Sequence, residues 1–474
     1  MIPRVLATPI PAPRGRPAAG RPRPIAPDVL EAVLPGPGRD RLAAGEVLVV
    51  TTGQQPGLFT GPLYTVHKAL SAIALAARLE RERRVPVVPV FWVAGDDHDF
   101  AEANHCAFLD ATGDARALVL RTRAAEAPQL PLSRETCGAD AARALEELRT
   151  RTPESEFKAG VLGWLAAAYR AEATLADAFA AAVQDLLGSR GLAVFRAHAL
   201  PAKRAAAPWV VKALELTLPD GLSPVLVEGR LGRDRLRGDG GAFATRRSGE
   251  RFTKAQIGEI AATAPDRLSP NVLLRPAVEA ALFPTVAYAA GPGELAYFPD
   301  TAPCYAALGV APQAAVPRWS GVLVESRVDK VLERFRIGVD DLKPPAGALE
   351  GRIAREELPP RTLELLERLR ATLTTDYDAL GLAAAAIDPT LERAVQSVRN
   401  QALGGTHDVE KKLVAASKRA HETLTAQVVK ARAALFPLGA PQERTLTIAS
   451  FLLRYGPALV DELAREVARW TDAL

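Results

Sequence analysis

Cysteine is scarce in this sequence and is never spaced for a metal site or a disulfide framework. Only three cysteines occur among 474 residues. Cys106, Cys137 and Cys304 are far apart and none belongs to a CxxC pair, which excludes a zinc finger and is typical of a reducing compartment. No local signature places a catalytic histidine beside Cys106 or Cys304, so we expect both thiols to pack in the core.

Long apolar runs and basic blocks are also missing. No apolar run is long enough to span a bilayer, and residues 1–40, rich in proline and arginine, lack the apolar core of a signal peptide. The 59 Lys and Arg residues, against 55 Asp and Glu, are spread along the chain without interleaved aromatics. We therefore expect a cytoplasmic globular protein that binds neither membranes nor nucleic acid. Anionic small molecules are the partners we expect for its arginines.

A glycine-rich turn between a predicted strand and a predicted helix is the most informative part of the sequence. Residues 46–50 are apolar and β-branched, which is typical of a buried strand. The turn has neither the dinucleotide fingerprint nor the Walker spacing. Pro62 suits the first helical position, and the free amides of this helix start favour an anion. His67 and Lys68 would lean back toward that anion. The turn supplies further polar candidates: Gln54, Gln55, Thr60, Gly61 and Tyr64.

Four ionisable residues follow the next predicted strand. Residues 87–93 form a second apolar run, and at its end come Asp96, Asp97, His98 and Asp99. Ligands bind outside the carboxyl ends of parallel strands, so this cluster and the glycine turn share one site if the two strands are neighbours. One carboxylate can hold an amine and another can act as a base or bind Mg²⁺, because crowded like charges raise one pKa. A solvated acidic turn and a helix N-cap are the simpler alternatives.

Two long segments are unusual enough to indicate a family. They are VVTTGQQPGLFTGPLYTVHKAL at residues 49–70 and VPVVPVFWVAGDDHDFAEANH at residues 85–105. Shorter segments agree with them: SPNVLLRP at residues 269–276, GPGELAY at residues 291–297 and, near the C-terminus, PQER and RYGP. On these segments the chain resembles the bacillithiol biosynthesis cysteine-adding enzyme family (BshC), over nearly its whole length.

The resemblance implies a ligase that joins cysteine to the amine of glucosaminyl-malate through an amide bond. A carboxylate is a poor electrophile, so the reaction needs activation, and we expect ATP to supply it. In this interpretation His67 and Lys68 hold phosphates. Asp97 or Asp99 orients or deprotonates the amine. Arg275 or Lys68 neutralises the malate carboxylates.

Polar residues elsewhere in these segments are further candidates for the site, although a structural role is the simpler alternative for each. Gly291 opens a second possible anion nest, and Arg275 can bind a carboxylate through two hydrogen bonds. The substrate-binding candidates outside the turn are Asp96, Asn104, Asn271, Arg275, Gly291, Glu294 and Tyr297. Three residues near the C-terminus are candidates for a second pocket that binds the nucleotide: Gln442, Arg444 and Tyr455. The simpler alternative is that they dock the last helix on the core.

Changes in composition divide the chain. We predict an α/β fold with a Rossmann-like parallel-sheet core, helical and small β insertions, and a C-terminal coiled-coil arm. The predicted segments are a loosely ordered proline-rich arm at 1–40, the core at 41–340 with insertions at 123–190 (helical) and 217–265 (small β unit), the coiled-coil arm at 341–440, and a helix at 441–474 that docks on the core. Within the core we expect a hairpin at 105–109 and 117–122 and a helix at 209–218.

Apolar residues at heptad-like spacing predict the arm. One stripe consists of Leu366, Leu369, Leu373, Tyr377 and Leu380, and another runs through Leu391, Val395, Val398 and Ala402. We expect an antiparallel helical hairpin that mediates a homodimer, with its turn near residues 381–389. Gly404 and Gly405 interrupt the second helix at a cost of roughly 1 kcal/mol each, so a kink or a split is expected there.

Two other functions stay open at this point. Asp97, His98 and Asp99 could be the metal ligands of an amidohydrolase or deacetylase acting on a related glycoside, and His105 adds a possible zinc ligand. The arm could instead make the chain a non-catalytic coiled-coil assembly protein. Stoichiometric bound zinc would favour the first alternative. Normal thiol output after loss of both His67 and Asp97 would favour the second. The ligase interpretation itself assigns no metal ligand.

Overall fold

The computed structural model describes residues 2–12, 15–124, 126–345, 347–420 and 422–473. The chain divides into two compact units. One runs to Val324 and resumes at Ala440, and the other spans Glu325–Gly439. The arm therefore begins at Glu325, earlier than the predicted residue 341, and its end agrees with the predicted residue 440 to within one position.

A five-stranded parallel sheet in the order β13-β12-β2-β3-β6 forms the centre of the first unit. Its strands are β2 (Leu48–Gln54), β3 (Val87–Val93), β6 (Ala193–Arg196), β12 (Thr285–Ala290) and β13 (Ala314–Pro317). All seven residues of β3 are buried, four of them valines, and β2 begins with buried Leu48, Val49 and Val50, as expected of strands covered on both faces. The predicted Rossmann-like core is confirmed, and the two predicted strands are indeed parallel neighbours. The strand order reverses direction between β2 and β12, which places the switch point there.

Alternation along β2 directs its side chains to two different cores. Leu48 and Val50 pack with Leu75 of helix α3 (Tyr64–Arg83) on one face, and Val49 packs on the other. Helices α8 (Leu200–Lys212) and α10 (Arg275–Leu282) belong to that second face. The helix predicted at 209–218 is wrong in position, because α8 begins with a proline in its first turn and ends at Lys212.

The insertions have the predicted character. The helical one contains α5 (Ala139–Arg151), α6 (Lys158–Ala168) and α7 (Leu175–Leu187), and the hairpin before it pairs β4 (His105–Leu109) with β5 (Ala115–Val119). An antiparallel sheet in the order β10-β9-β8-β7-β11 forms the small β unit. Its elements are β7 (Val225–Gly229), β8 (Gly232–Asp239), β9 (Ala242–Thr245), β10 (Arg251–Thr253), α9 (Lys254–Thr263) and β11 (Leu268–Pro270).

The N-terminal segment is not the loosely ordered arm that its composition suggested. Strand β1 (Arg4–Ala7) pairs antiparallel with β14 (Gly321–Val324). Two short helices follow, α1 (Pro27–Glu31) and α2 (Pro37–Ala43), each with proline in its first turn. Apolar side chains such as Val29 are buried against the second-face core, and this burial orders a segment in which proline and arginine dominate the composition.

The C-terminal segment docks on the core, as predicted, but as more than one helix. Helix α18 (Gln442–Thr445) precedes α19 (Ala449–Tyr455) and α20 (Ala458–Asp472), and α20 packs on α3. The single helix predicted at 441–474 is wrong, because Gly456 has a φ of 69° and ends α19. The remaining helices of this unit are α4 (Phe100–Ala103), α11 (Pro292–Tyr297) and α12 (Ala302–Leu308).

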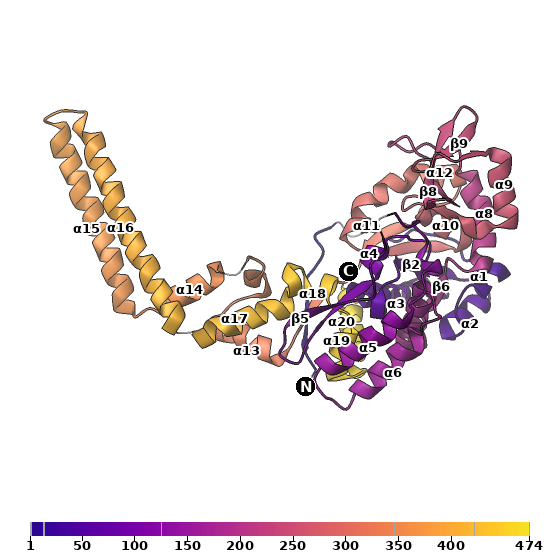
Figure 1. Cartoon of the computed structure of the whole chain (residues 1–474), viewed down its shortest axis with the longest axis horizontal. Coiled ribbons are helices and arrows are strands. Elements are labelled where there is room, and N and C mark those ends of the chain that lie inside the picture. Colours follow the sequence, from indigo (N-terminus) through magenta and orange to yellow (C-terminus); the bar gives the residue numbers. More distant parts are fainter. Residues whose placement is uncertain (1, 13–14, 125, 346, 421, 474) are drawn as a thin grey trace. The chain divides into compact units, whose positions relative to one another are not determined.

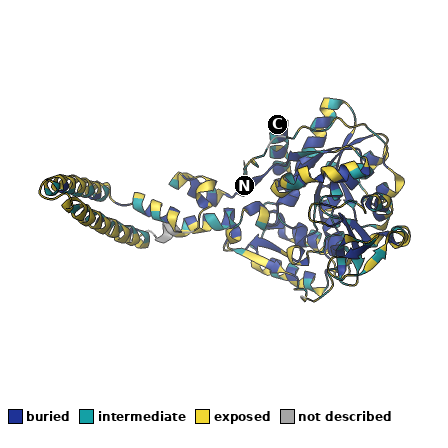
Figure 2. Cartoon of the chain, turned by 90° about the horizontal axis from the view of Figure 1, so that it is seen from above, coloured by how far each residue is buried: buried dark blue, intermediate teal, exposed yellow. Residues whose placement is uncertain are grey.

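The second unit is helical throughout. It contains α13 (Ser326–Phe335), α14 (Ala348–Glu356), α15 (Pro360–Ala385), α16 (Leu391–Ala420) and α17 (Glu422–Leu435). Figure 1 shows α15 and α16 as a long hairpin, which confirms the predicted coiled-coil arm. Helix α16 is continuous through Gly404 and Gly405, so the predicted interruption is wrong. Figure 2 shows that both long helices are largely exposed, in contrast to the buried strands of the core. Among the residues that the structure describes, no helix is both long and apolar enough to cross a bilayer.

Candidate active site

A cavity of about 510 Å³ opens at the carboxyl ends of β2, β3 and β12, where the strand order reverses. Its charged lining residues come from several elements: Lys68, Asp97, Glu102, Arg275, Glu294, Arg318 and Arg444. Uncharged lining residues include Gly53, Gln54, Gln55, Tyr64, Trp92, Gly291 and Tyr297. The two motifs singled out from the sequence therefore meet at one cavity.

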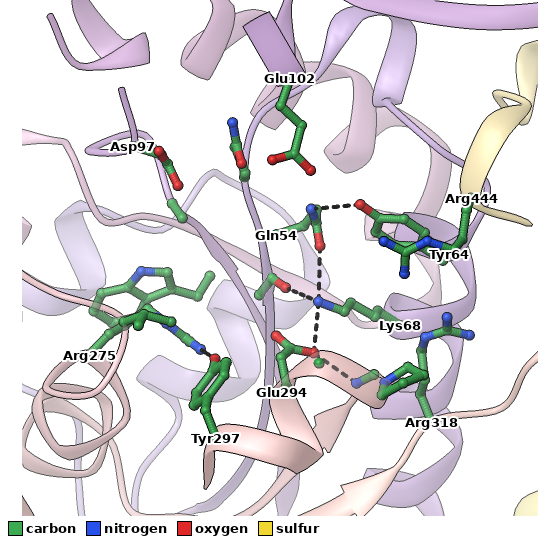
Figure 3. A pocket seen from close by; sticks show the side chains of 18 residues that line it. Gln54, Tyr64, Lys68, Asp97, Glu102, Arg275, Glu294, Tyr297, Arg318 and Arg444 are labelled. Carbon is green, nitrogen blue, oxygen red and sulfur yellow. Dashed lines mark hydrogen bonds and ion pairs between the residues drawn. The ribbon is translucent and has the colours of Figure 1, made fainter. Parts of the chain in front are cut away.

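Lys68 lies at the centre of this cavity (Figure 3). Its Nζ donates to the Gly53 carbonyl and to Oε1 of Gln54, both at 2.9 Å, and lies 2.9 Å from Oε2 of Glu294. The amide of Gln54 in turn donates to the Tyr64 hydroxyl at 3.2 Å. Burial lowers the pKa of Lys68, and the Glu294 carboxylate opposes that shift. The lysine is thus held rigidly by the end of β2 and by α11.

Glu294 and Arg275 form the neighbouring wall. Glu294 accepts from the Tyr288 hydroxyl at 2.5 Å and from the Gly291 amide at 2.8 Å. Burial would raise the pKa of Glu294, but the charges of Lys68 and Arg275 lower it, so the carboxylate is ionised. Arg275 donates to the hydroxyls of Tyr288 and Tyr297, each at 3.2 Å. The Gly291 amide is occupied by this carboxylate, so the second anion nest that we predicted there is closed.

Three cations surround the ring of Tyr64. Lys68 Nζ, the Arg318 guanidinium and the Arg444 guanidinium lie 5.9, 5.7 and 5.6 Å from the ring centroid. Burial raises the pKa of Tyr64 to about 12, so the hydroxyl stays neutral. This wall of the cavity is therefore cationic and suits a carboxylate or a phosphate.

An acidic wall lies across the cavity, where Figure 3 shows Asp97 and Glu102 on the side away from Arg318. Within the described residues, the Asp97 carboxylate accepts hydrogen bonds only from the nearby backbone amides of His98 and Asp99, at 2.7 and 3.1 Å. Burial raises the pKa of Glu102, and the charges of Asp99 and Asp97 raise it further. Such a carboxylate is a better proton acceptor than an ordinary glutamate.

The other members of the acidic cluster have structural contacts instead. Asp96 pairs with Lys203 at 2.7 Å. His98 lies 3.4 Å from the Arg233 guanidinium. Asp99 caps α4 by accepting from the Glu102 amide at 3.0 Å, which is the N-cap alternative weighed from the sequence. Only Asp97 of the four lines the cavity.

The glycine turn does not form the predicted anion nest. Helix α3 begins at Tyr64 with Leu63 as its N-cap, so Pro62 lies two residues before the first helical position. The Leu63 amide donates to the Leu446 carbonyl at 2.7 Å, and the Thr60 amide donates to the Tyr169 hydroxyl at 2.8 Å. These donors are occupied within the fold.

Several candidates lie outside the cavity. His67 has a fully buried side chain, with Nδ1 2.9 Å from Glu443. The other residues that the sequence proposed but that do not line the cavity are Thr60, Gly61, Asn104, Asn271, Gln442 and Tyr455. Asn271 accepts from the Leu274 amide at 2.8 Å, and Gln442 donates to the Leu323 carbonyl at 3.0 Å. Of the three residues predicted for a second pocket, Arg444 lines this cavity and Gln442 and Tyr455 do not.

Glu102 and Arg318 are the charged cavity residues that the sequence missed as candidates. Glu102 lies inside the family-like segment, one turn after Asp99, so helical spacing could have found it. Arg318 follows the short strand β13 and has no motif around it. Only the position of the strand in the sheet brings it to the site.

The described parts of the chain hold no group of three His, Cys, Asp or Glu side chains that could bind a metal ion. Asp97 and His98 therefore form the metal site of the amidohydrolase alternative neither with Asp99 nor with His105. All three cysteines are buried and free, as expected for Cys106 and Cys304.

Fold and cavity together define a Rossmann-like protein with a small-molecule site that carries both signs of charge. Comparison with known families specifies it further. Residues 39–218 and 226–319 match the N-terminal Rossmann-like domain of bacillithiol biosynthesis BshC, and residues 321–469 match its C-terminal coiled-coil domain. The chain belongs to the BshC family.

Curated relatives agree over most of their length. A protein of Heliobacterium modesticaldum is 32% identical over 466 residues, which cover 91% of this chain and 83% of that protein. One of Salinibacter ruber is 32% identical over 463 residues, covering 90% and 82%. One of Chlorobaculum tepidum is 29% identical over 470 residues, covering 90% and 82%. Each bears the name "Putative cysteine ligase BshC".

Proposed function

We propose that this protein is a ligase that joins cysteine to the amine of glucosaminyl-malate, as the last step of bacillithiol synthesis. The observation that carries the proposal is the division of one cavity into an acidic wall, with Asp97 and Glu102, and a cationic wall around Tyr64. The acceptor has an amine at one end and carboxylates at the other. The family and the names of the curated relatives support the same conclusion.

The roles follow from the charges. Asp97 holds the amine as an ammonium ion, and Glu102, with its raised pKa, takes the proton that the amine must lose. Arg318 and Arg444 bind the malate carboxylates. The amine nitrogen then bonds to the carboxyl carbon of cysteine, the group that activated this carboxyl leaves with the electron pair of its bond, and the second proton of the nitrogen passes to that leaving group or to water.

ATP, with Mg²⁺, is the activating molecule that we propose, because it converts the carboxylate into an adenylate or an acyl phosphate. The cationic wall fits a phosphate as well as a carboxylate, and Lys68 is the residue that would contact it. We do not assign this role to the Thr60 and Leu63 amides, which donate within the protein, or to His67, whose side chain is fully buried outside the cavity.

We further propose that the protein works as a cytoplasmic homodimer joined through the arm. The hairpin exposes large apolar side chains along its length: Leu365, Leu369, Leu380, Leu382, Ile387, Leu391, Val398 and Val409. Exposed apolar stripes on a helical pair favour association with another apolar surface.

A coupled assay tests the function. Purified protein is incubated with cysteine, glucosaminyl-malate and ATP, and the thiol product is followed by mass spectrometry together with AMP and ADP. Product with one equivalent of AMP identifies an adenylate, and product with one equivalent of ADP identifies an acyl phosphate. Asp97→Asn should lower the rate, whereas Asp114→Asn, on the exposed hairpin turn, is the matched control. Folded protein that yields no product would contradict the ligase proposal and favour an assembly role.

A further inference from the structure

Contacts from three distant segments meet at one buried carboxylate. Glu443 on α18 accepts from both terminal nitrogens of Arg318, at 2.7 and 2.9 Å, and from Nδ1 of His67 at 2.9 Å. The His67 and Arg318 side chains are 0% and 2% exposed. His67 belongs to α3, and Arg318 follows β13. The glutamate therefore ties a sheet-end arginine to a helix of the core.

Only Arg318 of these three residues lines the cavity. His67 lies against Trp319, with 4.6 Å between the ring centroids. Nη1 of Arg318 also donates to the Trp319 carbonyl at 2.8 Å, whereas its buried Nε has no hydrogen-bond partner in the described structure. A Cβ built on Gly291, at the cavity wall, would lie 3.5 Å from this Nε. The guanidinium is thus fixed from behind and keeps an unused donor near the cavity wall.

The protonation states of His67 and Glu443 determine the net charge of this cluster. Burial lowers the pKa of His67, so the ring is neutral at pH 7. A carboxylate only accepts, so Nδ1 of His67 carries the proton. Burial would raise the pKa of Glu443, but the hydrogen bonds from His67 and Arg318 lower it below its usual range. The cluster therefore contains one cation and one anion, and His67 holds the anion without adding a second positive charge.

We infer that His67 and Glu443 are positioning residues that fix the Arg318 guanidinium to bind an oxyanion, a carboxylate or a phosphate, in the cavity. His67 itself touches no ligand in this arrangement. Lys68, the next residue of α3, contributes its own cation directly to the same cavity. Helix α3 thus supplies the Lys68 ammonium group to the cavity, and through His67 and Glu443 it also orients the Arg318 guanidinium. The inference rests on the proposed function only for the choice of L-malate as a probe.

Two substitutions at one position separate a positioning role from a merely structural one. His67→Asn places an amide N–H where Nδ1 stands, whereas His67→Leu provides apolar bulk without a donor. L-Malate and, separately, inorganic pyrophosphate are titrated into the full-length protein by calorimetry. We expect His67→Leu to weaken binding of at least one anion about tenfold, the scale of one hydrogen bond to a charged group. His67→Asn should stay within about twofold of the wild type.

Further variants keep the test decisive. Glu443→Gln should weaken anion binding as His67→Leu does, because the amide nitrogen of glutamine cannot accept a hydrogen bond and the Arg318 guanidinium is no longer held by two. Leu148→Ala, at a fully buried position of α5 outside the cavity, destabilises the same unit and should leave affinity unchanged. If His67→Leu does not fold, His67→Gln replaces it, because its amide reaches the Nε2 position instead of Nδ1.

The outcomes are distinct. Equal affinity of His67→Leu and the wild type, or equal losses for the Leu and Asn variants, would overturn the inference. So would a folded wild-type protein that binds neither anion. The variants could show the expected anion binding while the wild-type protein forms no cysteine adduct. That result would leave the inference intact and contradict only the proposed ligase activity. Loss of pyrophosphate binding without loss of malate binding would assign Arg318 to the phosphate.

Discussion

Nζ of Lys68 lies 2.9 Å from Oε2 of Glu294, and this ion pair joins α3 to α11 across the floor of the cavity. The two side chains are only 7% and 16% exposed. Each charge is therefore stabilised mainly by the other, because few water molecules can reach the pair and replace either partner. The pair holds the lysine where a substrate anion meets it.

Removal of Lys68 should cost both stability and activity. Lys68→Met leaves the Glu294 carboxylate buried without its partner, and we expect the free energy of unfolding to fall by about 3 kcal/mol. Adding Glu294→Gln removes the unpaired charge, so the double variant should be more stable than Lys68→Met alone while remaining inactive. Urea unfolding and the coupled assay measure the two effects. Strictly additive stability losses would show that the charges do not interact.

The acidic wall should give the rate its dependence on pH. A base works only when ionised, so the rate should fall as the pH drops through the raised pKa of Glu102. Asp97→Asn removes a like charge that raises this pKa, so the acidic limb of kcat/KM should move to lower pH. Glu102→Gln should lower kcat about 100-fold and abolish the limb. A limb that survives in Glu102→Gln and vanishes in Asp97→Asn would instead assign the base to Asp97.

Glu443 should make stability depend on pH at the acid end. Its pKa in the folded protein lies below the ordinary 4.5, because hydrogen bonds from His67 and Arg318 outweigh burial. The unfolded state then binds more protons below pH 4.5, so this contribution is complete above that pH and is lost as the pH falls through the folded pKa. Glu443→Gln should be less stable at pH 7 by about 3 kcal/mol, and the difference should shrink toward pH 3. Urea titrations at several pH values measure it, and a difference independent of pH would contradict the expectation.

The sheet and the arm could be predicted because their signals are local. The valines of residues 46–50 and 87–93 and the leucine spacing of α15 specify elements without reference to distant parts of the chain. Glycines 404 and 405 show the limit of such arguments. Propensity predicts a break there, but about thirty residues of continuous helix, packed along α15, outweigh two unfavourable positions.

Part of the site was predictable because it borders strand ends. Lys68 and Asp97 follow β2 and β3 closely, so topology brings them together. The role of His67 depends on Glu443, 376 residues away in sequence, and no local pattern reveals such a partner. The same holds for Arg318, which reaches the cavity only because β13 lies beside β12.

The arm should control the oligomeric state. Leu369, Leu380 and Val398 are 48%, 53% and 49% exposed, and in a dimer such side chains would be covered. Replacing Leu369 and Leu380 by lysine should convert a dimer into a monomer, because two charges per chain oppose burial of the stripe. Light scattering after size exclusion gives the mass. The exposed charge Lys411→Glu serves as the control, and a wild-type monomer would defeat the proposed dimer outright.

Alanine at the two glycines of α16 should stabilise the arm. In the described structure, no atom other than those of the adjoining residues and the nearby backbone of the same helix lies within 4 Å of a Cβ built on Gly404 or Gly405, so a methyl group fits at both positions. Each Gly→Ala change should add about 1 kcal/mol to helix stability, because glycine loses more backbone freedom on folding. Hydrogen exchange of α16 amides should slow in the double variant, whereas Ala402→Gly, the opposite change on the same helix, should speed it. Faster exchange in the double variant would contradict this expectation. It would mean that the two glycines of the wild type make room for another surface, such as the arm of a second copy.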